Sequence, residues 1–163
     1  MLSDVYLGLG SNLGNRRGNL DRAFQLLRGL SSELTVSSLY ETSPEGFTGQ
    51  PAFVNAACGI WTRLSPYELL NMLKEVQVRV GARPAFVNGP RAVDIDILTY
   101  GRAVMDLSPG LTIPHLRMAE REFVLRPLAD IAPGLFHPVL GDTIEALLRH
   151  LASSDEAVPH ARR

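Results

Sequence analysis

Hydrophobic and polar positions follow two different periods along this chain. Runs of apolar and β-branched residues with period-two alternation predict strands, and apolar residues spaced three and four apart predict helices. The expected elements are strands at 5–9, 34–40, 53–62 and 93–97, and helices at 20–30 and 65–81. The order strand-helix-strand-strand-helix-strand is that of a ferredoxin-like α+β sandwich, with a mostly antiparallel sheet and helices packed on it.

Local signals mark where the second helix begins and ends. Ser65 is a capping residue, Pro66 suits the first helical position, and Glu68 completes a capping box with Ser65. Gly81 is the expected stop. The first helix is expected to end near Gly29 in the same way.

The C-terminal third predicts less regular structure. The sequence 100–102 is typical of a hairpin turn leading toward Val104. Apolar positions predict a short helix around 123–128 and an amphipathic helix at 143–151. We expect one domain over 1–152, followed by a loose polar tail at 153–163.

Composition narrows the classes of protein that remain. Sixteen basic residues against seventeen acidic ones argue against a nucleic-acid binder that relies on a basic surface. One cysteine excludes an intrachain disulfide framework and fits a reducing compartment. No apolar run reaches the length needed to span a bilayer, and the first residues do not look like a signal peptide. The expected location is the cytoplasm.

Two aspartates carry the clearest chemical signal. Because strand side chains alternate, Asp94 and Asp96 should project from one face while Val93, Ile95 and Ile97 project from the other. Such a carboxylate pair repels by roughly 2.5 kcal/mol at ~6.5 Å and an effective dielectric of ~20. An ordinary solvated face explains a bare Asp-x-Asp about as well as a cation does. Arg91 on a Gly-Pro turn tips the balance toward Mg²⁺ and a phosphorylated ligand.

Other candidate residues have an ordinary structural reading. Gly8 and Gly10 match a dinucleotide-binding turn poorly, and a tight turn from strand to helix is the better interpretation. Asn55 is equally explained as a structural bridge or as a ligand-reading amide. By themselves, His115 and Arg121 are more simply a junction residue and a solvated helix charge.

Taken together, these segments resemble one family closely. The resemblance covers the chain to about residue 150, and its Gly-Pro-Arg-x-x-Asp-x-Asp core is highly specific. The family is 6-hydroxymethyl-7,8-dihydropterin pyrophosphokinase, an ATP-dependent diphosphokinase of folate biosynthesis. The matching motifs are Gly10-Ser11-Asn12-Leu13-Gly14, Thr42-x-Pro44-x-Gly46, Phe53-Val54-Asn55-Ala56, Gly89-Pro90-Arg91-x-x-Asp94-Ile95-Asp96-Ile97, and Pro114-His115 followed by Arg121-x-Phe123-Val124-Leu125-x-Pro127-Leu128.

The resemblance implies transfer of pyrophosphate from ATP to the pterin hydroxymethyl group, with release of AMP. It implies that Asp94 and Asp96 hold two Mg²⁺ ions and that Arg91 joins them as a catalytic residue. It leaves open whether neighbouring folate enzymes associate with the protein. The implied ATP-binding residues are Gln77, Arg83, Arg91, Ile97, Thr112, His115 and Arg121, and the implied pterin-binding residues are Thr42, Ser43, Glu45, Phe53, Asn55 and Phe123.

Three positions depart from the family's pattern. Asn88 stands where an aromatic residue often precedes Gly-Pro-Arg, and Gln77 stands where a glutamate is common. The arginine expected directly after Gly81 is Ala82 here, with Arg83 one place later. These changes bear on nucleotide affinity and loop closure more than on the type of reaction.

Two other functions stay open from the residues alone. The same strand order serves RNA-binding modules, whose central strands display aromatic residues for base stacking. Asp94 and Asp96 would repel a phosphate backbone in the absence of metal, which disfavours that reading. The other alternative keeps the Mg-ATP site but transfers to a different small alcohol. Phe53, Asn55 and Phe123 favour a pterin.

Overall fold

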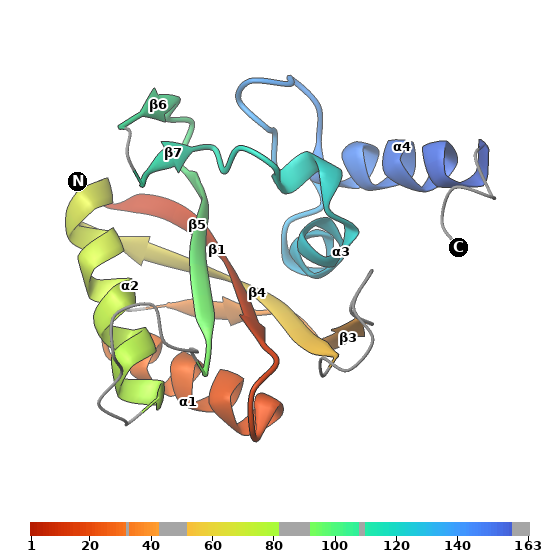
Figure 1. Cartoon of the computed structure of the whole chain (residues 1–163). Helices are drawn as coiled ribbons and strands as arrows, with labels where there is room; N and C mark the ends of the chain where they lie inside the picture. Colours follow the sequence, from red (N-terminus) through yellow and green to blue (C-terminus); the bar gives the residue numbers. More distant parts are fainter. Residues whose placement is uncertain (32, 43–51, 82–91, 108–109, 158–163) are drawn as a thin grey trace.

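The computed structural model describes residues 1–31, 33–42, 52–81, 92–107 and 110–157. Its elements build one α+β unit in which a sheet separates two groups of helices (Figure 1). The strands are β1 (Ser3–Ser11), β2 (Leu34–Val36), β3 (Tyr40–Thr42), β4 (Phe53–Thr62), β5 (Asp94–Tyr100), β6 (Met105–Asp106) and β7 (Thr112–Ile113). The helices are α1 (Arg16–Arg28), α2 (Pro66–Gly81), the 3-10 helix η1 (Met118–Glu120), α3 (Glu122–Ile131) and α4 (Ile144–Ala157).

The main sheet has the order β2-β4-β1-β5, and β3 extends the β2 edge by pairing with β4. Every pairing in it is antiparallel. If β2 and β3 are counted as one interrupted strand, the two halves of a strand-helix-strand repeat interleave in the ferredoxin-like manner. The predicted fold class is therefore confirmed.

One face of the sheet packs on α1 and α2. Val5, Leu7 and Leu9 of β1 alternate into this core, which also contains Leu20 and Leu27 of α1. Cys58 of β4 is fully buried here, and burial raises the pKa of its thiol to about 12. The apolar stripes found in the sequence thus build the main core.

The opposite face is only partly covered. Leu125 and Leu128 of α3 pack with Ala57 and Leu98 of the sheet in a second core, to which α4 adds Ile144. Figure 1 shows α3 and α4 on the side of the sheet away from α1 and α2. The described helices on this face pack mainly over β4, through α3.

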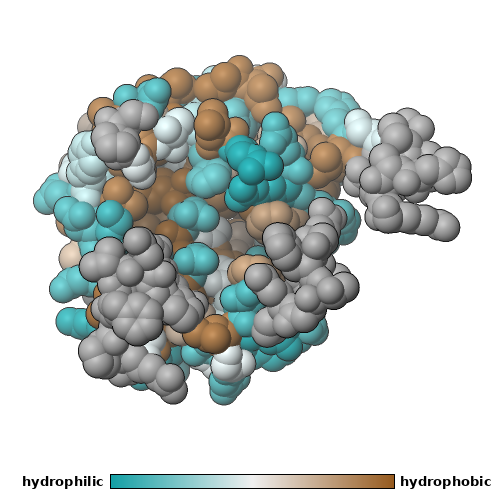
Figure 2. All heavy atoms as spheres, viewed as in Figure 1, coloured by the Kyte–Doolittle hydropathy of each residue, from teal (hydrophilic) through white to brown (hydrophobic). Residues whose placement is uncertain are grey.

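Two contacts fix α3 to the edge of the sheet. The Tyr40 hydroxyl donates to Asp130 Oδ2 at 2.7 Å, and the Ser38 backbone N–H donates to the same oxygen at 3.3 Å. The hydrogen bond to Asp130 raises the pKa of Tyr40. The connection between α3 and α4 exposes Phe136, Val139 and Leu140, and Figure 2 shows hydrophobic side chains gathered there at the top of the view.

The predicted capping box is confirmed in both directions. Glu68 Oε1 accepts from the Ser65 N–H at 3.0 Å, and Ser65 Oγ accepts from the Glu68 N–H at 3.3 Å. Gly29 caps α1, as its position in the sequence predicted. Among the described residues, no helix combines the length and apolar composition that crossing a bilayer requires.

Three predicted elements differ in the structure. The strand expected at 34–40 is divided, because the Ser37 hydroxyl accepts from the Ala57 N–H at 2.8 Å and interrupts the pairing. The turn at Gly101 forms with φ +54, but the hairpin expected after it is wrong: β6 pairs with β7 rather than with β5. The last helix continues to Ala157, so the expected loose tail is helical over its first residues.

Candidate functional site

Two glycines of β1 lie beside the candidate site, of which Gly8 is covered by the Leu98 side chain, 3.3 Å from where a Cβ would lie. Gly10 of β1 lies between Asn55 of β4 and Asp94 of β5 in the sheet register, and Gly8 lies between Ala57 and Asp96. The interpretation of Gly8 and Gly10 as a turn from strand to helix is wrong, because both lie inside β1. Residues paired directly across antiparallel strands share a face, so Asn55 and Asp94 flank a bare strip of backbone roughly 10 Å wide.

The missing side chain at Gly10 lets neighbouring side chains approach the strand closely. A Cβ there would lie 3.0 Å from Asn55 Oδ1 and 3.6 Å from Phe53 Cδ1. Gly10 therefore lets Asn55 and Phe53 stand beside an open strand surface. The sequence signal was present as Gly8-x-Gly10, but its meaning depends on the register with β4 and β5.

Asp94 and Asp96 project from one face of β5, as predicted. Both are exposed, whereas Ile95 and Ile97 between and after them are buried against the helices on the other face. The next residue, Leu98, is skipped in the register between β1 and β5. This bulge lets Leu98 enter the second core beside α3 while Thr99 pairs with Tyr6.

The donor set at this position suits a hard cation held jointly with a ligand. No group of three or more acidic, histidine or cysteine side chains capable of holding a metal occurs in the described part of the chain. Two exposed carboxylates on adjacent same-face positions of a strand are the protein share that Mg²⁺ takes when phosphates and water complete its octahedron. Asp94 and Asp96 fit that arrangement.

His115 lies between the acidic strand and the cationic segment before α3. Its backbone N–H donates to the Leu98 carbonyl at 2.9 Å, which fixes this segment to β5. Burial lowers the pKa of His115; Asp96 opposes the shift, and Arg121 and Arg117 reinforce it. A lowered pKa favours the neutral imidazole of His115, which can both donate and accept a hydrogen bond.

Arg121 and Phe123 form a stacked pair at the beginning of α3. The Arg121 guanidinium carbon lies 5.6 Å from the centre of the Phe123 ring, within cation–π range. Arg121 is the N-cap residue, and its side chain makes no capping hydrogen bond. Phe123 is 41% exposed, which is unusual for a large aromatic side chain and consistent with a stacking surface.

Asn55 acts as a structural bridge. Its Nδ2 donates to Thr42 Oγ1 at 2.9 Å, and Asn55 is only 5% exposed. The bond fixes the orientation of the amide and leaves Oδ1 beside Gly10. Of the two readings left open for Asn55, the structural bridge is present, and the ligand-reading role stays a prediction. Thr42 pairs with Phe53, which places both at the same end of the face.

Three predicted ATP-binding residues make contacts within the protein or are buried. Gln77 Oε1 accepts from the Ile95 backbone N–H at 2.9 Å. The Ile97 side chain is buried on the helix face, so only its main chain remains for the predicted contact. Thr112 lies in the small β6–β7 sheet and donates to Asp106 Oδ1 at 3.4 Å. The predicted residues Ser43, Glu45, Arg83 and Arg91, with Ala82 and Asn88, lie outside the described residues.

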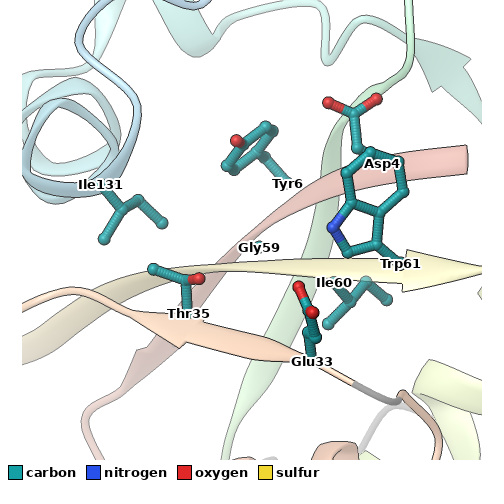
Figure 3. A pocket seen from close by; sticks show the side chains of 8 residues that line it. All are labelled: Asp4, Tyr6, Glu33, Thr35, Gly59, Ile60, Trp61 and Ile131. Atoms are coloured by element: carbon teal, nitrogen blue, oxygen red, sulfur yellow. The ribbon is translucent and has the colours of Figure 1, made fainter.

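A second hollow lies at the other end of the same sheet face (Figure 3). Trp61 lies across from Asp4, and Tyr6 lies across from Gly59. In Figure 3, Ile131 of α3 closes one side and Glu33 approaches from the β2 edge. Asp94, Asp96 and Asn55 do not line this hollow, so the predicted site residues identify the other end.

Comparisons with known proteins identify the family. The sequence model described as 7,8-dihydro-6-hydroxymethylpterin-pyrophosphokinase matches residues 6–133. A Pseudomonas aeruginosa protein named 2-amino-4-hydroxy-6-hydroxymethyldihydropteridine pyrophosphokinase is 40% identical over 140 residues, covering 85% of this chain and 86% of the relative. The folic acid synthesis protein FOL1 of Dictyostelium discoideum is 40% identical over 147 residues, covering 90% of this chain and 22% of the relative.

Solved structures support the fold independently. The HPPK-DHPS of Plasmodium falciparum, wild type with pteroate, superposes with a TM-score of 0.80 at 16% identity, covering 100% of this chain and 47% of that one. The chain spans between 20% and 27% of the length of the fungal, slime-mould and plant relatives it matches, several of which are named bifunctional folate synthesis proteins. The chain belongs to the 7,8-dihydro-6-hydroxymethylpterin-pyrophosphokinase family.

Proposed function

We propose that the protein transfers pyrophosphate from ATP to the hydroxymethyl group of 6-hydroxymethyl-7,8-dihydropterin and releases AMP. The observation that carries this proposal is the placement of Asp94 and Asp96 on the same sheet face as Asn55, with Gly8 and Gly10 between them. One side of the glycine strip offers carboxylates for a metal–phosphate group, and the other offers an oriented amide for a ring edge.

The reaction needs positioning and positive charge more than a strong base. The pterin hydroxyl oxygen forms a bond to the β-phosphorus of ATP, the bond from that phosphorus to the α,β-bridging oxygen breaks, and the hydroxyl proton leaves to solvent. Charge spreads over the phosphoryl oxygens in the transition state, and cationic groups stabilise it. Arg121, whose charge lowers the pKa of His115, and Arg91 are the cations proposed for this role.

Asp94 and Asp96 are the residues proposed to hold magnesium, in the family's two-ion arrangement. When bound, the metal would neutralise phosphate charge and align the triphosphate. The protein's own contribution is a rigid pair of carboxylates at fixed spacing on a strand. Arg83, Thr112 and the Ile97 main chain are proposed to complete the ATP-binding set. Gln77 is left out of this set because its side chain contacts the Ile95 backbone of β5.

The pterin is proposed to lie between Phe53 and Phe123. A flat heteroaromatic ring gains stacking energy from two aromatic faces and specificity from a fixed hydrogen-bonding edge. Asn55, held by Thr42, is the described candidate for reading that edge. Ser43 and Glu45 are proposed to add contacts from the following loop.

Release of AMP tests the reaction directly. The protein is incubated with Mg²⁺-ATP and 6-hydroxymethyl-7,8-dihydropterin, and AMP and the pterin diphosphate are quantified by chromatography. The matched control is 6-methyl-7,8-dihydropterin, which keeps the ring but lacks the attacking hydroxyl. We expect AMP only with the hydroxymethyl compound. ADP formation, or equal AMP with both pterins, would contradict pyrophosphate transfer to this acceptor.

Association with neighbouring folate enzymes is proposed from the relatives in which a matching segment forms part of a longer folate synthesis protein. We also propose a cytoplasmic location, because the single cysteine is buried and free. Co-purification of the protein with other folate enzymes from its own cells, and fractionation of those cells, test the two statements.

A further inference from the structure

The strand that carries the two aspartates lies at the edge of the main sheet. β5 pairs with β1 on one side, and within the described part of the chain no strand of the main sheet lies on its outer side. Edge strands have backbone groups that the sheet does not pair, and their position is therefore less constrained. The spacing and direction of Asp94 and Asp96 depend on how this edge is held.

Gln77 of α2 forms a hydrogen bond with the outer edge of β5 at Ile95, the residue between the two aspartates. Its side-chain oxygen accepts from the Ile95 N–H at 2.9 Å. Gln77 is half-buried, and α2 packs on β5 through the main core. The helix thus supplies, through one side chain, a hydrogen bond that a neighbouring strand would otherwise make.

Ser11 and Asn19 hold the beginning of the same segment from the other side. The Ser11 hydroxyl, which is 1% exposed, donates to the Ala92 carbonyl at 2.6 Å. Asn19 Nδ2 lies 3.3 Å from the same carbonyl oxygen, 3.2 Å from Ser11 Oγ and 2.8 Å from the Leu13 carbonyl oxygen. Ala92 directly follows Arg91 and precedes Asp94 by two residues, so this cluster fixes the chain at the entrance to β5.

We propose that Ser11, Asn19 and Gln77 are positioning residues that set the geometry of Asp94 and Asp96. The three side chains act through backbone groups at Ala92 and Ile95 and therefore reach the aspartates indirectly. This inference rests on the proposed function and deepens it: Gln77 serves the metal strand rather than the nucleotide. It also assigns a role to Ser11 of the Gly-Ser-Asn-Leu-Gly motif, which the substrate contacts do not explain.

Magnesium makes the position of this strand consequential. Mg²⁺ demands near-octahedral geometry at about 2.0–2.1 Å and tolerates displacement of its carboxylates poorly. Residues that orient metal ligands from behind typically change metal affinity by about 10–100-fold when removed. Loss of the bonds at Ala92 or Ile95 should therefore raise the magnesium requirement, with a smaller effect on turnover at saturating metal.

Hydrogen exchange of the Ile95 amide tests the Gln77 contact without any reaction. We expect Gln77→Ala to speed this exchange about fivefold or more in the ligand-free protein, because the amide loses its acceptor. Gln77→Glu keeps an acceptor oxygen and should retain slow exchange. Gln25→Ala, on the exposed face of α1, is the matched control and should leave Ile95 unchanged.

Magnesium titration of the reaction tests the consequence. Gln77→Ala and Ser11→Ala should raise the half-saturating Mg²⁺ concentration about tenfold, with the KM for ATP at saturating metal changed less than about twofold. Ser3→Ala, at the opposite end of β1, is the control for Ser11→Ala. Ser11→Ala also provides an independent variant if Gln77→Ala fails to fold by circular dichroism.

The two hypotheses fail in different ways. If Ile95 exchange is unchanged in Gln77→Ala, or if exchange is faster while the magnesium requirement stays at the control value, the positioning role is wrong. Both results leave the proposed reaction intact, provided Asp94→Ala and Asp96→Ala still abolish AMP release. If those two variants remain active, the proposed metal role is wrong instead, whatever the exchange data show.

Discussion

The two open ends of one sheet face contain similar residue types and differ in chemistry. Each end has carboxylates, an aromatic side chain and a glycine in a central strand. At the candidate site, Gly10 lies between Asn55 and Asp94, and a Cβ there would lie 3.0 Å from the polar Asn55 Oδ1. At the far end, a Cβ at Gly59 would lie 2.9 Å from Cε1 of the Tyr6 ring, so the two glycines differ in what they face and not in free space.

Charge separates the two ends as clearly as shape does. The aspartates of the candidate site face a segment with His115 and Arg121, and Asp96 and Arg121 both influence the pKa of His115. The far hollow contains Asp4 and Glu33, and its described lining includes no lysine or arginine. Residue types alone therefore do not separate the two ends, whereas the nearby cations do.

The largest expected difference concerns the aspartates. Asp94→Ala or Asp96→Ala should reduce turnover at least about a hundredfold, because the metal loses half of its protein ligands. Asp4→Ala, on the same face beyond α3, should change turnover less than about twofold. Steady-state AMP release at modest Mg²⁺ measures both, with circular dichroism to verify folding. A similar loss of turnover in Asp4→Ala would show that the two ends of the sheet face do not differ in function.

The next largest difference between the two ends should be in ligand binding by their aromatic and amide side chains. Phe123→Ala and Asn55→Ala should each weaken pterin binding by roughly 1–3 kcal/mol, through lost stacking or an unmatched ring edge. ATP binding should change far less. Trp61→Ala removes the exposed aromatic residue of the far hollow and should alter neither ligand. Calorimetry decides the matter, and equal losses for ATP and pterin would indicate a general packing defect.

The glycines give a smaller but sharper test. In Gly10→Ala the new methyl group would press on Asn55 Oδ1, so pterin affinity should fall about tenfold with little change in stability. In Gly59→Ala the Tyr6 ring must move, which should lower the free energy of unfolding by ~1–2 kcal/mol and leave pterin binding intact. Urea unfolding and calorimetry measure the two quantities. A loss of pterin binding in Gly59→Ala would contradict this expectation and indicate that the two ends of the sheet face are coupled.

Histidine titration should give the smallest effect. Burial lowers the pKa of both His115 and His137 below the ordinary value of 6.5. The unfolded chain then binds more protons than the folded one, so each histidine makes stability fall as pH drops through 6.5 toward its folded pKa. Mg²⁺-nucleotide should raise the pKa of His115 alone, because phosphate charge favours the protonated ring. Proton NMR titration with and without a non-hydrolysable nucleotide checks this, and equal shifts at both residues would contradict it.

Local signals in the sequence were the most dependable. The capping box of Ser65 and Glu68 needs only three residues of separation, and both of its hydrogen bonds are present. The interruption at Ser37 depends on Ala57, twenty residues away in the chain. No local pattern could predict it, because a serine in a β-prone run is ordinary until its partner strand is known.

The same distinction applies to the site. Strand alternation was sufficient to place Asp94 and Asp96 together on one face. The position of Gly10 between Asn55 and Asp94 was not predicted, because a glycine before a helix is locally typical of a turn and its neighbours are set by the strand register. The sequence shows only that Gln77 departs from a family pattern. Its contact with Ile95 could not be predicted, because it depends on the packing of α2 on β5.

Cys58 has a practical consequence for experiments on this protein. It is the only cysteine of the chain, it is fully buried, and its thiol pKa is about 12. Thiol reagents attack the thiolate, so they should leave the native protein unmodified near neutral pH and react when the core opens. The native protein should therefore not react with thiol-specific dyes. A cysteine introduced on its surface would be labelled at that one position.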